Sequence, residues 1–280
     1  MLLTIGDLID DVLVRRAGGL ERGTDNPATI RHARGGSAAN VAAAAAASVA
    51  TRFIGCVGDD AAGDALVHRL ERAGVDVRVQ RGERTGTIVI LVDDEGERTM
   101  VTDRGAAAEL GPIDPSWLEG VDWVHVPLYG FSSEPSRSAI LEAVERMRRP
   151  PARVSLDLSS VATMRELGTD ELRALIARLR PDVVFANRDE AGCAEALAFD
   201  LSSVEAYIVK RGGEPVVVRV GGDDMQVPVE PVEGLIDSTG AGDAFAAGYI
   251  AAAMNGADAA SAARAGAGLA RRALAELGAL

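Results

Sequence analysis

Short apolar runs alternate with amphipathic stretches along most of this chain. Runs such as LLTI, TRFIGCVG, WVHVPLY, RVSLDLS and DVVFAN each precede a segment with helical spacing of its apolar residues. Segment 60–74, DAAGDALVHRLERAG, is amphipathic and closes on Gly74, a residue typical of helix C-termini. Repeated strand–helix units with apolar strands predict an α/β fold, with a mostly parallel central sheet flanked by helices on both faces.

Two segments, 12–34 and 77–104, interrupt this alternation, because each contains strand patterns without a helix between them. The first holds VLVRR and ATIRHAR, and the second holds VRVQ, TGTIVILVDD and ERTMVTDR. The stretch VDDEGERTM is typical of a hairpin. We therefore expect a single domain over 1–280 with a small β-sheet lid built from these inserted strands, and a second hairpin in EPVVVRVGG and MQVPVEPV.

Composition and charge narrow the function classes. The chain has 280 residues, 48% of them hydrophobic, enough for one large α/β domain. Its net charge of −13 argues against nucleic acid or an anionic membrane as partner. Cys56 and Cys193 lack metal or redox spacing, MLLTIGDLID does not resemble a signal peptide, and VAAAAAASVA is too short to span a bilayer. These features predict a cytoplasmic protein.

The stretch 237–249, DSTGAGDAFAAGY, carries the most specific chemistry. Gly240, Ala241 and Gly242 would be costly inside a helix, but at a helix start their small side chains leave backbone N–H groups open to an anion. Asp243 is then either an acid that stabilises the helix N-terminus or a base that works beside a phosphate. The spacing alone leaves both open.

The sequence lacks the motifs that are typical of several familiar enzyme classes. No lysine follows a glycine-rich loop in the P-loop pattern, no GxGxxG follows the first strand, and no GxSxG is present. The three histidines, His32, His68 and His125, have no metal-ligand spacing. We expect His125 to be a core residue and His68 a surface residue.

A combination of motifs resembles the ribokinase family of carbohydrate kinases, also called the phosphofructokinase-B family. The motifs are GDLIDD at 6–11, GGSAAN at 35–40, NRDE at 187–190 and DSTGAGD at 237–243. They occur in the family's order over nearly the whole chain. The resemblance implies an ATP-dependent kinase that transfers the γ-phosphate to a primary hydroxyl of a ribose-, fructose- or keto-sugar-like substrate.

The resemblance also assigns site residues. Asp243 matches the catalytic base, and Gly240, Ala241 and Gly242 match the anion hole for the transferring phosphate. The substrate-binding positions are Asp11, Gly35, Gly36, Asn40 and Arg104. The nucleotide or cofactor positions are Asn187, Lys210, Gly212, Gly213 and Thr239. Glu190 and Asp237 match metal positions, Glu190 supporting Mg²⁺ through water, and Asp237 and Thr239 lie where some members bind a monovalent cation such as K⁺.

For several of these positions a structural role is the alternative. Asn187 and Glu190 fit a simple helix cap, Asn40 a helix start, Asp11 a solvated strand end, and Arg104 a surface arginine. On the nucleotide side the sequence departs from the family, because Pro215 takes a later glycine position and the final helices lack the asparagine often found near adenine.

Two functional alternatives remain at this point. One is a nucleoside kinase of the adenosine or pseudouridine type, with Phe53, Trp123, Tyr129 and Phe131 available to stack on a base. The other is a catalytically silent sugar-binding sensor, against which the intact Asp243 and anion hole argue. Since lids of this family often pair, the resemblance also implies a homodimer.

Overall fold

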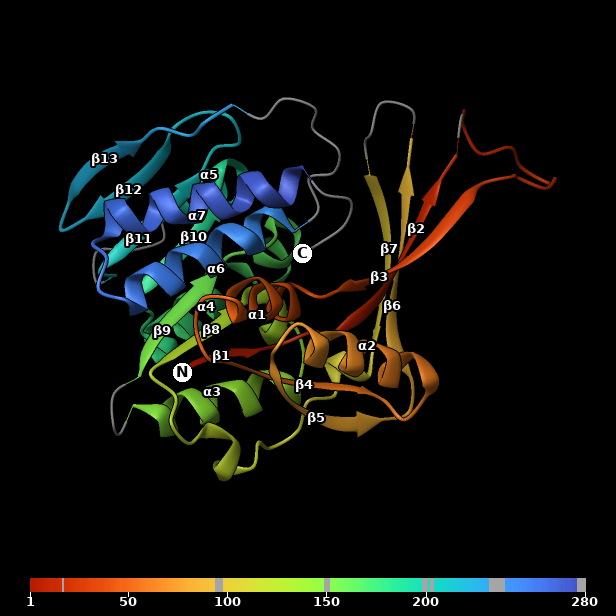
Figure 1. Cartoon of the computed structure of the whole chain (residues 1–280), viewed down its shortest axis with the longest axis horizontal. Coiled ribbons are helices and arrows are strands. Elements are labelled where there is room, and N and C mark those ends of the chain that lie inside the picture. Colours follow the sequence, from red (N-terminus) through yellow and green to blue (C-terminus); the bar gives the residue numbers. More distant parts are fainter. Residues whose placement is uncertain are drawn as a thin grey trace.

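The computed structural model describes residues 1–16, 18–93, 98–148, 152–197, 201, 204–231 and 240–275. Within these ranges the chain forms a large sheet covered by helices and a smaller sheet that projects to one side (Figure 1). The helices are α1 Ser37–Ala46, α2 Ala61–Arg72, α3 Ser136–Met147, α4 Val161–Leu179, α5 Arg188–Ala196, α6 Ala241–Met254 and α7 Ala259–Leu274. Short 3₁₀ segments span Ala106–Ala108, Pro115–Leu118 and Leu128–Phe131. None of the described helices is both long and apolar enough to cross a membrane.

The large sheet has the order β13-β12-β11-β10-β9-β8-β1-β4-β5. Its strands are β1 Leu2–Ile5, β4 Thr51–Gly58, β5 Asp76–Gly82, β8 Trp123–Pro127, β9 Arg153–Asp157, β10 Val183–Asn187, β11 Ala206–Lys210, β12 Val216–Val220 and β13 Asp223–Val227. Pairing is parallel from β5 through β11, and β12 and β13 add the predicted antiparallel hairpin. The predicted α/β class is therefore confirmed.

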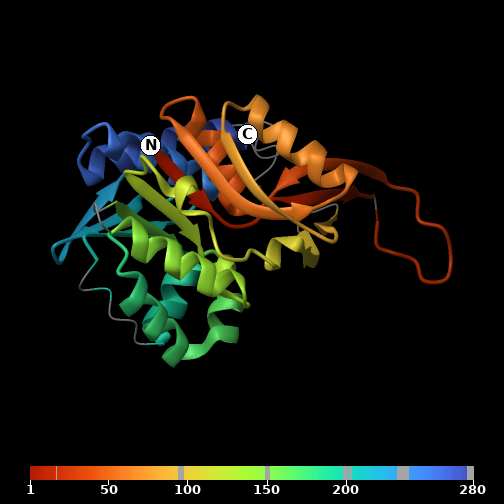
Figure 2. The same ribbon diagram turned by 90° about the horizontal axis from the view of Figure 1, so that it is seen from below.

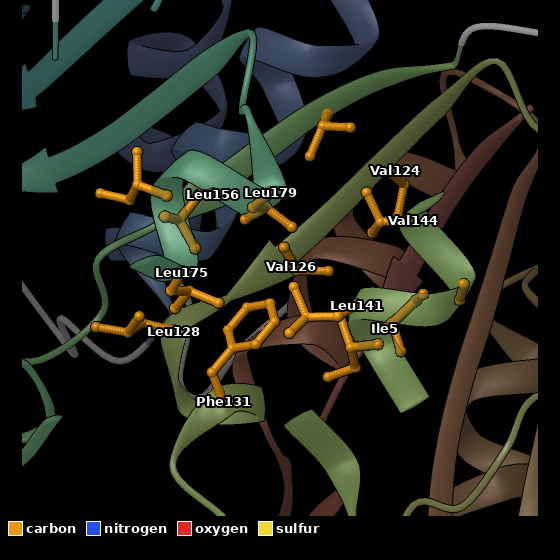
Figure 3. Close-up of a cluster of buried hydrophobic side chains, with 14 of the residues drawn as sticks. Ile5, Val124, Val126, Leu128, Phe131, Leu141, Val144, Leu156, Leu175 and Leu179 are labelled. Carbon is orange, nitrogen blue, oxygen red and sulfur yellow. The ribbon is translucent and has the colours of Figure 1, made fainter. Parts of the chain in front are cut away.

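Consecutive residues of the central strands supply two separate cores, because successive side chains in a strand point to opposite faces. Leu3 packs with Val124 and the helices α3, α4 and α5, whereas Leu2 packs with Trp123 and the helices α1, α6 and α7. Figure 2 shows these two helical layers on opposite sides of the sheet. Figure 3 shows the first core, where Phe131 and Leu141 meet Val126.

The smaller sheet has the order β3-β2-β6-β7, with β2 Ile9–Arg15, β3 Thr29–Gly35, β6 Thr85–Val92 and β7 Arg98–Gly105. It combines the two helix-free segments, and its two central strands, β2 and β6, run parallel. One assignment was wrong: VRVQ at 77–80 belongs to β5 at the edge of the large sheet, not to the small sheet. Strand β5 lies at the edge of the sheet and is half exposed, so its mixture of polar and apolar residues resembles that of an antiparallel strand. It nevertheless pairs in parallel with β4, as the second strand of a β4–α2–β5 unit.

Candidate active site

The carboxyl ends of three neighbouring strands bring polar and charged side chains together. Asp157 ends β9, Asn187 ends β10 and Lys210 ends β11, and the pairing register sets Asn187 beside Lys210. Ligands of open α/β sheets bind beyond this edge. A cleft of about 1030 Å³ opens there, lined by these three residues and by the start of α6.

The start of α6 has the geometry of an anion site. Gly240, with φ 73°, occupies the N-cap in a left-handed conformation that glycine adopts without strain. The first backbone N–H groups of a helix have no partner inside the helix, and those of Ala241, Gly242 and Asp243 lie at the cleft. A Cβ on Gly242 would lie 3.4 Å from Lys210 Nζ, so the glycine leaves room for the lysine.

The carboxylate of Asp243 is held by two residues of the first turn of α1. Ser37 Oγ donates to Asp243 Oδ1 at 2.6 Å, and Asn40 Nδ2 donates to Oδ2 at 3.0 Å. Burial raises the pKa of Asp243 to about 6, although both hydrogen bonds lower it. A carboxylate with a pKa near neutrality can accept a proton from a hydroxyl group in the course of a reaction.

Lys210 and Asp157 form a buried ion pair on the cleft floor, with Nζ 2.7 Å from Asp157 Oδ2. Burial lowers the pKa of Lys210, but the charge and hydrogen bond of Asp157 outweigh it, so the pKa is raised. The lysine therefore stays a cation beside the helix N-terminus. The cleft therefore has a cation and the open amides of α6 on the side where a phosphate would bind.

Asn187 and Glu190 form a complete capping box at the start of α5. Asn187 Oδ1 accepts from the Glu190 backbone N–H at 2.9 Å, and Glu190 Oε2 accepts from the Asn187 N–H at 2.7 Å. The structural alternative for this motif is thus realised. The capping box alone does not explain why a carboxylate is buried at this position. Burial, followed by repulsion from Asp157, raises the pKa of Glu190 to about 7.

Asp11 lies within β2 and is 6% exposed, so the structural alternative of a solvated strand end is wrong. Burial, followed by repulsion from Asp10 and Asp243, raises its pKa to about 7. Its Oδ1 has no hydrogen-bond partner among the described residues. A Cβ on Gly35 would lie 2.0 Å from this oxygen, so any other residue there would displace the Asp11 carboxylate.

Arg104 is not a surface arginine, because it forms a fork-like ion pair with Asp7. Its Nε and Nη2 lie 3.0 and 2.6 Å from the two Asp7 carboxylate oxygens, and both side chains are mostly buried. The carbonyl of Asp7 also lies 2.1 Å from where a Cβ on Gly36 would be, and Gly36 has φ 97°. Asp7 thus organises both Arg104 and the GGSAAN turn.

Comparison with known proteins decides the family. The model of the pfkB family of carbohydrate kinases matches residues 1–280. The chain belongs to this family. A fructokinase from Salmonella typhimurium is 32% identical over 273 residues, covering 90% of this chain and 84% of that protein. An ATP-dependent ribose-1-phosphate kinase from Halopiger xanaduensis is 34% identical over 241 residues, covering 81% and 76%.

The solved structures agree with this membership. The crystal structure of an adenosine kinase from Sinorhizobium meliloti superposes with a TM-score of 0.87 at 25% identity, covering 99% of this chain and 94% of that one. As a pfkB-family carbohydrate kinase, the protein is a phosphotransferase with an alcohol group as acceptor. Its membership leaves the silent sensor without support.

In this pfkB-family kinase the predicted residues separate into two groups. Nine line the cleft: Asn187, Glu190, Lys210, Gly212, Gly213, Gly240, Ala241, Gly242 and Asp243. Asp11, Gly35, Gly36, Asn40 and Arg104 cluster at the junction between the small sheet and α1. Asp237 and Thr239 fall outside the described residues.

The motifs gave no role to three residues that contact the predicted site residues: Ser37, Arg34 and Asp7. Ser37 lies within GGSAAN, Asp7 lies within GDLIDD and Arg34 directly precedes GGSAAN, so their places in or beside these motifs were the available signal. His125 is fully buried, where its Nδ1 shares a hydrogen bond of 2.9 Å with Ser155 Oγ, as expected of a core histidine. His68 is exposed, as expected.

Proposed function

We propose that this pfkB-family kinase transfers the γ-phosphoryl group of ATP to a primary hydroxyl of a sugar, with Asp243 as general base. The observation that carries the proposal is the position of Asp243, whose carboxylate lies beside the open N–H groups of α6 on the cleft wall. The substrate oxygen attacks the γ-phosphorus, its proton passes to Asp243, and ADP leaves with the electrons of the broken P–O bond. The amides of Gly240–Gly242 would stabilise the charge on the transferring group.

The residues present fit a magnesium ion on the Glu190 side of the cleft. Glu190 is 3% exposed, lies close enough to Asp157 for the two charges to repel, and has its pKa raised to about 7. A hard divalent cation would relieve this repulsion, and carboxylate oxygen is the ligand Mg²⁺ prefers. When bound, the ion would neutralise phosphate charge. No group of three or more potential metal ligands gathers in the described part of the chain, so most of its coordination would come from phosphates and water.

The acceptor would bind at the junction formed by Asp11, Asn40 and Asp243. The unpartnered Oδ1 of Asp11 is an acceptor for a sugar hydroxyl, and burial strengthens such a contact. Gly35 and Gly36 keep the backbone open next to it. The fructokinase and ribose-1-phosphate kinase relatives support a five- or six-carbon sugar.

The ATP end of the cleft is apolar, with Val216, Val229, Phe245, Ala267 and Ala270 in its wall. Gly212 and Gly213 border the same space, where a Cβ on either would meet nothing within 4 Å. A purine held by packing in this wall does not need the asparagine that the final helices lack. This supports ATP as donor.

A nucleoside acceptor is the second candidate, supported by the adenosine kinase from Sinorhizobium meliloti. Of the four aromatic residues considered for stacking, Phe53, Trp123 and Phe131 are buried in the cores, whereas Tyr129 lines the cleft. A base would therefore have one aromatic partner among these four. The sugar remains the better supported acceptor.

We also propose that the small sheet acts as a lid and as a dimer interface. Arg98 and Met100 of β7 line the cleft, so closure of this sheet would exclude water from the phosphates. The pairing register aligns Ile30, Val14 and Leu91 in one row and Val12, Val89 and Val101 in the next. Ile30 and Val101 are 59% and 61% exposed, which favours a second copy as the partner.

The test is an ATP-consumption assay with a panel of hexoses, pentoses, sugar phosphates and nucleosides, run beside Asp243→Asn. A sugar that supports turnover only in the parent enzyme would support the proposal. Turnover with nucleosides alone would favour the second candidate, and equal turnover by Asp243→Asn would refute the base assignment.

A further inference from the structure

The side chain of Arg34 reaches from the small sheet into the active site. Arg34 lies in β3, one residue before Gly35, and its Nε and Nη2 lie 3.4 and 3.3 Å from Asn40 Oδ1. Asn40 Nδ2 in turn donates to Asp243 Oδ2 at 3.0 Å. A continuous chain of contacts thus runs from β3, through the first turn of α1, to the carboxylate at the start of α6.

The guanidinium fixes the orientation of the Asn40 amide. In the observed orientation the amide oxygen faces a cation and the amide nitrogen faces an anion. Rotation by 180° would place the NH₂ group against the guanidinium of Arg34 and the oxygen against Asp243, so both contacts would become repulsive. The distances from Arg34 Nε and Nη2 to Asn40 Oδ1 are long for hydrogen bonds. Both donors belong to a charged guanidinium, however, and both favour the same orientation of the amide.

Both carboxylates and cations surround the chain of contacts from Arg34 to Asp243. Burial lowers the pKa of Arg34, while the carboxylates of Asp243 and Asp11 raise it and Arg69 lowers it further. An arginine keeps its charge under these conditions. The charged groups that act on Asp243, Arg34 and Asp11 are Asp10 and Asp11 of β2, Arg34 of β3, Arg69 of α2, Asp157 of β9, Lys210 of β11 and Asp243 of α6.

We propose that Arg34 is a positioning residue of this kinase, which acts through Asn40 to fix the direction in which the Asp243 carboxylate faces the acceptor hydroxyl. The inference rests on the proposed function, in which Asp243 is the base. Because Arg34 belongs to β3, the position of the small sheet and the orientation of the base are linked. Arg34 itself need not touch the substrate.

The first test compares Arg34→Met and Arg34→Lys with the control Arg31→Met, which removes an exposed arginine from the same strand. Misorientation of a retained base predicts a fall in kcat of about 10- to 100-fold for Arg34→Met, with a much smaller change in the KM of the acceptor. Arg34→Lys keeps the charge but not the fork, so it should restore part of the loss. The control should match the parent.

The pH profile of kcat gives a readout that a merely structural role would not change. Without the Arg34 cation, and with the Asn40 amide free to rotate, the acidic limb of the profile should move to higher pH in Arg34→Met. An unchanged limb together with an unchanged kcat would overturn the proposal. If Arg34→Met does not fold, as judged by its thermal midpoint, the same measurements apply to Arg34→Lys.

A double-mutant cycle with Asn40→Ala tests whether the effect passes through Asn40. If it does, Arg34→Met should cost kcat less than about threefold in the Asn40→Ala background, because the contact is already lost. Fully additive losses would overturn the proposal, and so would a rise in KM with kcat intact, which would make Arg34 a direct substrate ligand. Failure of the base assignment is seen separately, as turnover retained by Asp243→Asn.

Discussion

Lys210 Nζ and Asp157 Oδ2 lie 2.7 Å apart on the cleft floor. Lys210 ends β11 and Asp157 ends β9, the two strands that flank β10 in the large sheet. The pair is mostly buried, and Glu190 and Asp243 both act on Lys210 electrostatically. Lys210 therefore interacts with three carboxylates. Its loss would leave the carboxylate of Asp157 without its ion-pair partner in a poorly solvated place.

Lys210→Met is accordingly expected to destabilise the fold by about 3 kcal/mol and to weaken ATP binding, because removing one partner leaves a buried charge unpaired. Thermal or urea unfolding and calorimetric titration with ATP measure the two effects. Arg219→Met is the control, since its ion pair with Asp224 is nearly half exposed and worth about 0–1 kcal/mol. Equal stability losses in the two variants would contradict the buried-pair interpretation.

Asp243→Asn keeps the shape of the residue but removes the proton acceptor. Turnover should fall about 10²- to 10⁴-fold, while ATP affinity is unchanged or slightly higher, because the amides of α6 stay in place. A structural acid at a helix N-terminus would instead cost about 0.3–1 kcal/mol of stability with turnover kept. Turnover and thermal midpoint on one preparation separate these outcomes.

Activity and stability should respond to pH in opposite directions. Asp243 works as a base only when ionised, so kcat should rise as the pH rises through about 6. The raised pKa values of Asp11, Glu190 and Asp243 mean that the folded state binds protons more tightly than the unfolded state, so stability should decline from about pH 4 to about pH 7. Each pKa unit is worth about 1.4 kcal/mol. Urea unfolding across this range should show a shallower decline in Asp243→Asn than in the parent.

Asp11→Ala should weaken acceptor binding by roughly 1.5–3 kcal/mol, because a buried charged acceptor for a hydroxyl is lost. Nucleotide binding should be largely kept, since Asp11 lies outside the cleft wall that borders the ATP end. Calorimetry with each ligand measures the split. A collapse of ATP affinity with sugar affinity intact would reverse the assignment.

Charging the exposed apolar rows of the small sheet should disrupt the proposed homodimer. Val101→Lys places a charge on the exposed edge strand β7 of that face, and light scattering at micromolar concentration should report a monomer for the variant and a dimer for the parent. His68→Lys on the exposed side of α2 controls for the added charge. A monomeric parent would remove the basis for the dimer.

The sequence predicted the architecture and the cleft motifs because both are local signals. Alternating strands and helices specify a parallel sheet, and Gly240–Asp243 and Asn187–Glu190 each carry their geometry within a few residues. The contacts of Ser37 and Arg34 could not be predicted. The Ser37 contact depends on how α1 packs against α6, and the Arg34 contact with Asn40 depends on how the chain turns from β3 into α1. VRVQ was misassigned for the same reason, since its membership in the large sheet depends on pairing with β4 rather than on its own pattern.

The hydrogen bond between Ser37 and Asp243 joins residues 206 positions apart in the chain. The base and the turn that holds it are therefore brought together only after the chain has been synthesised through α6 and this helix has docked on the sheet. Contacts of such long range close late and slowly. Partly folded or incomplete chains would lack an oriented base, so they would not hydrolyse ATP wastefully while folding, and the onset of phosphorylation would itself report completion of the tertiary structure.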